Sequence, residues 1–148
     1  MNTTYNRSSI YREISIHTSS PTKLVVMLYQ GALRFLRQAI DDIGQKNYSN
    51  KSQSIDRTVA IIQHLQGTLD LEKGQEIAYD LDRLYTYMSS RIFDGSAKLD
   101  VPALQEVAKL LETLLSGWEE IARKEQEHTV PTDLLVQQAG NGRFELHA

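Results

Sequence analysis

The chain has 148 residues, of which 41% are apolar and 24% are charged, and these values are typical of one soluble globular domain with a buried core. A formal net charge of -3, with no local block of Lys or Arg, disfavours nucleic-acid binding, and the absence of cysteine excludes disulfides, thiolate zinc sites and thiol catalysis. The first twenty residues lack the apolar core of a signal peptide, and no apolar run is long enough to span a bilayer, so we expect a cytosolic protein.

A first helix is predicted from Pro21 to about Gly44. Ser20 is a suitable N-cap, and proline is tolerated at the first helical position because its missing N–H is not needed there. Apolar residues then recur at steps of three and four, which indicates an amphipathic helix and not a strand. Leu24 and Met27 widen the apolar stripe at its beginning, so this end is either more deeply buried than the rest or faces a partner.

A second helix is predicted over about residues 50–69, after a polar turn. The helical spacing of its apolar residues favours a buried stripe, made of Ile55, Val59, Ile62, Leu65 and Leu69.

A third helix is predicted to follow a tight corner and to extend to about residue 97. Asp70 is a candidate N-cap, and Gly74 is a candidate for a left-handed backbone conformation. We expect Tyr85 at the edge of its apolar stripe and Tyr87 to point elsewhere. The predicted stripe is Ile77, Leu81, Leu84, Met88 and Ile92.

A fourth helix is predicted to start at an Asp100 cap, with Pro102 in its first turn. Trp118, the only tryptophan, falls on its apolar stripe and is expected in the core. The stripe comprises Leu104, Val107 or Ala108, Leu111, Leu114 or Leu115, Trp118 and Ile121.

Together these patterns predict an all-α fold, an antiparallel four-helix bundle, because short connections cannot return the chain along the length of a helix. The predicted organisation is an N-terminal segment over residues 1–19 that docks onto the bundle, the bundle over residues 20–126, and a flexible tail over residues 127–148.

Catalytic and metal-binding motifs are not found in the sequence. A di-iron bundle needs two Glu-x-x-His motifs, and only Glu125 and His128 have this spacing, at the end of the last helix. Phosphate-binding, dinucleotide-binding and nucleophile-elbow motifs are absent from the sequence. We therefore predict a binding protein, with no enzymatic activity, no cofactor and no metal.

Tyrosine is the more informative residue, with seven in the chain. Tyr29, Tyr79, Tyr85 and Tyr87 fall on the first and third predicted helices. Such rings either pack at the margin of the core with wet hydroxyl groups or together line a binding groove.

The sequence resembles the flagellar secretion chaperones of the FliS family over about residues 10–124. The resemblance rests on Tyr11 ten residues before Pro21, and on four features in the family's order: SSPTKLVVMLYQGALRFL, LDLEKGQEIAYDLDRLYTYMSSRI, GWEEIA around Trp118, and the four-helix pattern. Ser19 and Gln30 depart mildly from the usual family pattern, and the tail after Glu127 lies outside it.

The resemblance implies a cytosolic chaperone that binds the disordered C-terminal segment of flagellin, prevents premature filament assembly and hands the subunit to the membrane export gate. A disordered client would lay amphipathic helices into apolar grooves between the chaperone's helices. We expect Ile10 and Tyr11 to cover a groove when the client is absent. The residues predicted to bind the partner are Ile10, Tyr11, Leu24, Met27, Leu28, Tyr29, Tyr85 and Tyr87.

An alternative from another class is a self-associating helical-bundle adaptor with a partner other than flagellin. In that case the apolar surplus of the first and third helices would be buried in a homodimer or a larger oligomer.

Overall fold

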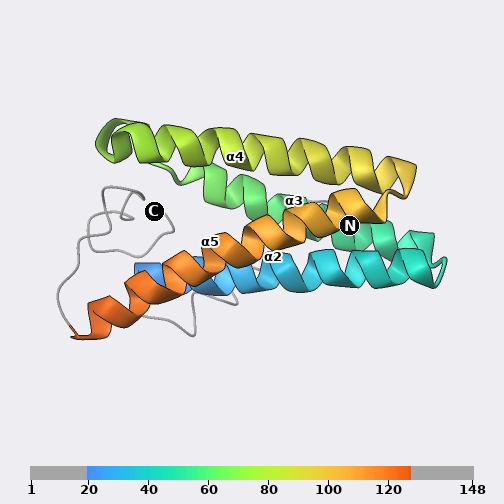
Figure 1. The fold of residues 1–148 in the computed structure, drawn as a ribbon, viewed down its shortest axis with the longest axis horizontal. Coiled ribbons are helices and arrows are strands. Elements are labelled where there is room, and N and C mark those ends of the chain that lie inside the picture. The colour runs from blue at the N-terminus through green and yellow to red at the C-terminus, as the bar shows by residue number, and fades with distance from the viewer. Residues whose placement is uncertain (1–19, 128–148) are drawn as a thin grey trace.

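A computed structural model describes residues 20–127 of the chain, and these residues form four long helices (Figure 1). In chain order the helices are α2 (Pro21–Gly44), α3 (Tyr48–Gly67), α4 (Leu71–Lys98) and α5 (Val101–Glu127). Short connections over residues 45–47, 68–70 and 99–100 reverse the chain between successive helices. The predicted all-α antiparallel bundle is confirmed. The predictions for residues 1–19 and 128–148 lie outside the described residues.

The predicted caps explain where the helices begin. Ser20 before α2, Asp70 before α4 and Asp100 before α5 each accept a hydrogen bond from a backbone N–H of the following first turn, at 3.0–3.3 Å. These bonds satisfy donors that have no partner within a helix. Asn47 plays the same part before α3, which therefore begins two residues earlier than the polar turn suggested.

The core runs along the middle of the four helices. α2 packs extensively on both α3 and α5, whereas α4 contacts α3 and α5 less extensively. Trp118 is buried as predicted, with 4% of its surface exposed. The helical periodicity accounts for this core, because its members recur at steps of three, four or seven residues along each helix: Val25, Leu28, Ala32 and Leu36 of α2, Ile55, Val59, Ile62 and Leu65 of α3, and Leu104, Val107, Leu111 and Trp118 of α5.

The buried stripe of α4 is rotated relative to the prediction. Tyr85 is fully buried, Leu84 is half-buried, and Ile77 is 57% exposed instead of lying in the core. The core side of α4 passes through Leu81 and Tyr85 and continues to Met88 and Ile92, at steps of four, three and four residues. Apolar residues at 77 and 84 fit a helical stripe equally well, so only the neighbouring helices select the register.

The first turns of α4 contain a backbone break that was predicted one residue too early. The non-helical angles belong to Gln75 (φ 52°, ψ -135°) and not to Gly74. Glycine normally occupies this region of backbone space because it has no Cβ, so the conformation is strained at a glutamine. The break separates the capped first turn of α4 from the long straight part that carries Tyr85.

α4 and α5 lie close together at the turn that joins them and separate toward the first residues of α4 (Figure 1). α5 instead follows α2, which agrees with its more extensive packing on that helix. The divergence leaves the side of α5 that faces α4 incompletely covered by the bundle itself.

Candidate partner-binding surface

Four of the predicted partner-binding residues lie in the interior of the bundle. Leu24, Leu28, Tyr29 and Tyr85 have between 0% and 2% of their surface exposed. Deep burial therefore accounts for Leu24 and Leu28 at the beginning of α2. A partner can touch these side chains only if α2 or α4 moves away from its neighbours.

The two interior tyrosines meet at their hydroxyl groups. The Tyr29 and Tyr85 oxygens are 2.5 Å apart, and either group can donate the hydrogen bond. Burial raises the pKa of Tyr29 to about 12, an effect that hydrogen bonds from Tyr85 and Trp118 partly offset. Burial also raises the pKa of Tyr85. Both phenols are therefore neutral near pH 7, and they join α2 and α4 across the core.

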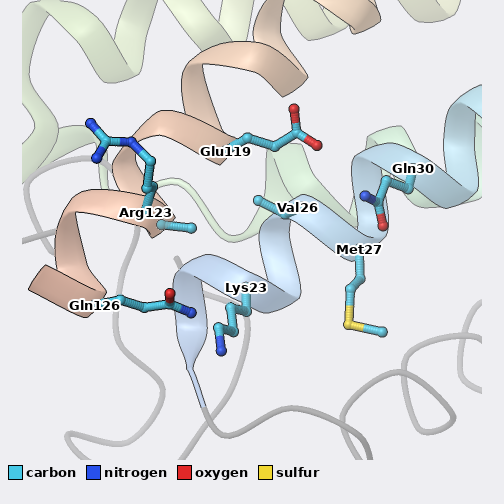
Figure 2. A pocket seen from close by; sticks show the side chains of 8 residues that line it. Lys23, Val26, Met27, Gln30, Glu119, Arg123 and Gln126 are labelled. Carbon is cyan, nitrogen blue, oxygen red and sulfur yellow. The ribbon is translucent and has the colours of Figure 1, made fainter.

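Met27 lies instead at the surface, in a pocket between the beginning of α2 and the end of α5 (Figure 2). The pocket has a volume of about 420 Å³. Val26 points across it toward α5, while Glu119 and Gln126 extend from α5 toward α2 (Figure 2). We call it the α2–α5 pocket, and its lining consists of Lys23, Val26, Met27, Gln30, Glu119, Ala122, Arg123 and Gln126.

The pocket has an apolar floor and a charged rim. Val26, Met27 and Ala122 are half-buried, so their apolar surface is only partly covered. Arg123 is held by Glu120 and Glu127 of its own helix, at 2.5 and 2.8 Å. Among the described residues, neither Lys23 nor Glu119 forms an ion pair, so both charges are available to an occupant.

A second pocket of about 520 Å³ lies further along the same two helices. Arg37 of α2 and Glu112 of α5, which form an ion pair, both line it, together with the half-buried Ile40. This lining is richer in charge than that of the first pocket, and none of the predicted partner-binding residues lies in it.

Tyr87 lies on the exposed surface of α4, with 44% of its area accessible. Its hydroxyl donates to Glu106 Oε2 at 2.5 Å, and Arg91 Nε donates to Glu106 Oε1 at 2.8 Å. Both hydrogen bonds lower the pKa of Glu106, and the bond from Tyr87 has the larger effect. The three side chains join α4 and α5 on the side where these helices face each other.

Apolar residues continue from this polar junction along both helices. Leu84 and Ile77 precede Arg91 at seven-residue intervals, about two turns each, and therefore lie on its side of α4. On α5, four residues follow Glu106 at steps of three or four and lie on its side: Leu110, Leu114, Gly117 and Ile121. The three apolar side chains of α5 and Leu84 are half-buried, and Ile77 is exposed. We call these six residues the α4–α5 flank.

The α4–α5 flank and the lining of the α2–α5 pocket, apart from Met27, were missed by the sequence analysis. Leu114 and Ile121 were assigned to the core because they fit the stripe of α5, whose apolar positions cover more than one side of the helix. Gly117 carried a detectable signal, because a glycine inside a helix costs stability without an evident local reason. Apart from its two chain neighbours and the backbone of its own helix, no atom of the described residues lies within 4 Å of the place that a Cβ at Gly117 would occupy.

Within residues 20–127, the structure offers no group of three or more His, Asp or Glu side chains that could hold a metal ion. Glu125, considered above as a metal ligand, accepts a hydrogen bond from the Thr22 hydroxyl at 2.9 Å. No helix in the same range is both long and apolar enough to cross a membrane. Ile10 and Tyr11, also predicted to bind the partner, lie outside the described residues.

Comparison with known proteins gives a consistent result. The model of the family described as flagellar protein FliS matches residues 1–125. The flagellar secretion chaperone FliSB of Pseudomonas aeruginosa is 35% identical over 116 residues, covering 76% of this chain and 92% of the relative. The flagellar secretion chaperone FliS of Salmonella typhimurium is 34% identical over 113 residues (76% and 84%), and that of Bacillus subtilis is 28% identical over 122 residues (82% and 90%).

Proposed function

Because the chain belongs to the FliS family of flagellar proteins, we propose that it is a flagellar export chaperone. In this proposal it acts in the cytoplasm, binds the disordered C-terminal segment of flagellin and keeps it from polymerising prematurely. It then delivers the subunit to the membrane protein of the flagellar export gate. The mechanism is binding without catalysis, and it needs no cofactor.

The observation that best supports a binding function is the apolar surface that the bundle leaves uncovered. Ile77 and Tyr87 are 57% and 44% exposed on α4, and the apolar residues of α5 on the α4–α5 flank are half-buried. α4 diverges from α5 toward the first residues of α4 (Figure 1), and in this proposal the client lies along the flank of these two helices. An amphipathic segment that docks there would gain apolar burial to offset the entropy lost on ordering.

The proposal places direct client contacts at Tyr87 and Met27, which are accessible in this structure. The interior residues Leu24, Leu28, Tyr29 and Tyr85 would hold α2 and α4 in place, and would meet the client only in a rearranged bundle. A client that wraps around the bundle to reach both Met27 and Tyr87 would bury more than about 2,000 Å², the range of extensive interfaces.

Ile10 and Tyr11 have a separate part in the proposal. They cover an apolar groove when the client is absent and move away when it binds, so that the export gate distinguishes loaded from empty chaperone. The alanine variants Ile10→Ala and Tyr11→Ala are then expected to change client affinity or export. Unchanged affinity together with unchanged export would remove this switch from the mechanism.

Isothermal titration of the full chain with the C-terminal segment of flagellin from the same organism tests client binding. We expect saturable one-to-one binding with a large negative heat-capacity change, because folding onto an apolar surface removes apolar area from water. Tyr87→Ala should weaken the affinity about tenfold or more, as expected for a buried interfacial tyrosine. Tyr79→Ala is the matched control, since Tyr79 is also an exposed tyrosine of α4 (49%) but lies away from the α4–α5 flank.

Two outcomes would contradict the proposal. Absence of binding at high micromolar concentration would mean that flagellin is not the client. Equal weakening by Tyr79→Ala and Tyr87→Ala would remove the α4–α5 flank as the docking surface. The solution mass of the free protein addresses the adaptor alternative, because a tight oligomer would favour self-association.

A further inference from the structure

The α2–α5 pocket lies beside the point where the chain leaves the described bundle. Gln126, one of its lining residues, is in the last turn of α5, and Lys23 lines the same end of the pocket from the first turn of α2 (Figure 2). The chain continues from there for 21 further residues, 128–148. This stretch lies beyond residue 125, where the match to the family ends, so any role it has belongs to this chain and not to the shared bundle.

Residues 128–148 contain one apolar triplet preceded by an acid, Asp133-Leu134-Leu135-Val136. Seven residues separate Glu127 from Leu134, and an extended chain of that length reaches about 25 Å. The pocket spans the part of α2 from Lys23 to Gln30, which is about 10 Å of helix. The triplet can therefore reach the whole length of the pocket.

We propose that the C-terminal segment of this chain folds back and places Leu134, Leu135 and Val136 in the α2–α5 pocket. The floor of the pocket offers half-buried apolar side chains, Val26, Met27 and Ala122, to this triplet. Burial of the triplet against them removes apolar surface of both partners from water.

The order of charges along the pocket agrees with the direction in which the chain would enter. Lys23, which forms no ion pair among the described residues, is at the end where the chain leaves α5, and Asp133 is the residue that arrives before the apolar triplet. Glu119, the acidic rim residue, lies at the opposite end with Gln30 (Figure 2). Docking in this direction would therefore place Asp133 beside Lys23 and the apolar triplet beside the apolar side chains that line the pocket.

Because the chain has no cysteine, disulfide trapping gives a direct test in the full-length protein. The double variant Met27→Cys with Leu135→Cys places one thiol in the pocket and one in the triplet. The control Lys124→Cys with Leu135→Cys places the first thiol on an exposed position of α5, outside the pocket and closer to Leu135 along the chain. Rates of reaction of each single-cysteine variant with a small thiol reagent correct for intrinsic reactivity.

If the segment docks, the Met27–Leu135 pair should oxidise within one chain at least tenfold faster than the control pair, after this correction. Adding Asp133→Lys to the Met27–Leu135 pair should slow its oxidation several-fold, because the lysine would face Lys23. Equal rates for the two pairs, or a faster control pair, would overturn the proposal, since an undocked segment would reach the nearer position at residue 124 at least as readily. Disulfides formed mainly between chains would also overturn it, because a second copy would then be the occupant.

The experiment uses the free protein, so its result does not depend on flagellin binding. If the Met27–Leu135 disulfide forms rapidly but the protein binds no flagellin, the proposed function is wrong and this inference stands. If the protein binds flagellin but the disulfide forms no faster than the control, this inference is wrong and the proposed function stands.

Discussion

Removing the hydroxyl of either Tyr29 or Tyr85 is expected to destabilise the bundle, and the two losses are not expected to add. Both rings are buried, and their oxygens are 2.5 Å apart. Each hydroxyl group has the other as its buried hydrogen-bond partner. The two side chains therefore form a polar pair in the core between α2 and α4.

The expected magnitudes follow from the partners that each change leaves behind. Each single variant, Tyr29→Phe or Tyr85→Phe, removes the shared hydrogen bond and leaves the other hydroxyl group buried and unpaired. Each should therefore cost about 1–3 kcal/mol. The double variant should cost no more than either single variant, because it leaves no hydroxyl group unpaired.

Urea unfolding at pH 7 measures these free energies. Trp118 is the single tryptophan and is buried, so its fluorescence reports loss of the core, and circular dichroism at the helix bands provides a second probe. The double-mutant cycle then gives a coupling free energy, which we expect to be about 1 kcal/mol. Agreement between the two probes checks that unfolding is two-state.

Two results would contradict this prediction. If the costs of the two single variants simply add in the double variant, the hydroxyl groups do not interact. If either single variant has the stability of the unchanged protein, the hydrogen bond between the two hydroxyl groups does not stabilise the bundle.

Two further predictions concern pH and two glycines. The pKa of Tyr29 is raised to about 12 from an ordinary value of 10.0, so the stability that its neutral form contributes is fully present below pH 10 and is lost as the pH rises from 10 through 12. The loss in unfolding free energy should approach about 2.7 kcal/mol and should be smaller in the Tyr29→Phe variant. Unfolding curves of both proteins at alkaline pH measure this difference, and identical pH dependence in the two proteins would contradict the prediction. Gly95→Ala should destabilise by about 1–2 kcal/mol, because its Cβ would lie 3.1 Å from the Ala103 Cβ, whereas Gly117→Ala should stabilise by about 0.5–1 kcal/mol because no described atom is near. Thermal unfolding measures the Tm of both variants, and a change in Tm of the same sign for Gly95→Ala and Gly117→Ala would contradict the prediction.

The four helices and most of their boundaries follow from local patterns in the sequence. The helix caps are formed by Ser20, Asp70 and Asp100, which bond to amides two or three residues away. Such short-range interactions can be predicted from the order of neighbouring residues. The short connections then required antiparallel neighbours. The position of Trp118 followed from the same periodicity.

The tertiary structure alone decided which side of each helix is buried where the apolar pattern is broad. Leu84 and Tyr85 are adjacent in the sequence, and both fit a helical stripe, but the neighbours of α4 bury the ring of Tyr85 and leave Leu84 at the margin. Ile77 is 57% exposed, although it fits the same helical stripe. Likewise, the α2–α5 pocket joins residues about a hundred positions apart, and no local periodicity encodes how closely two such segments approach.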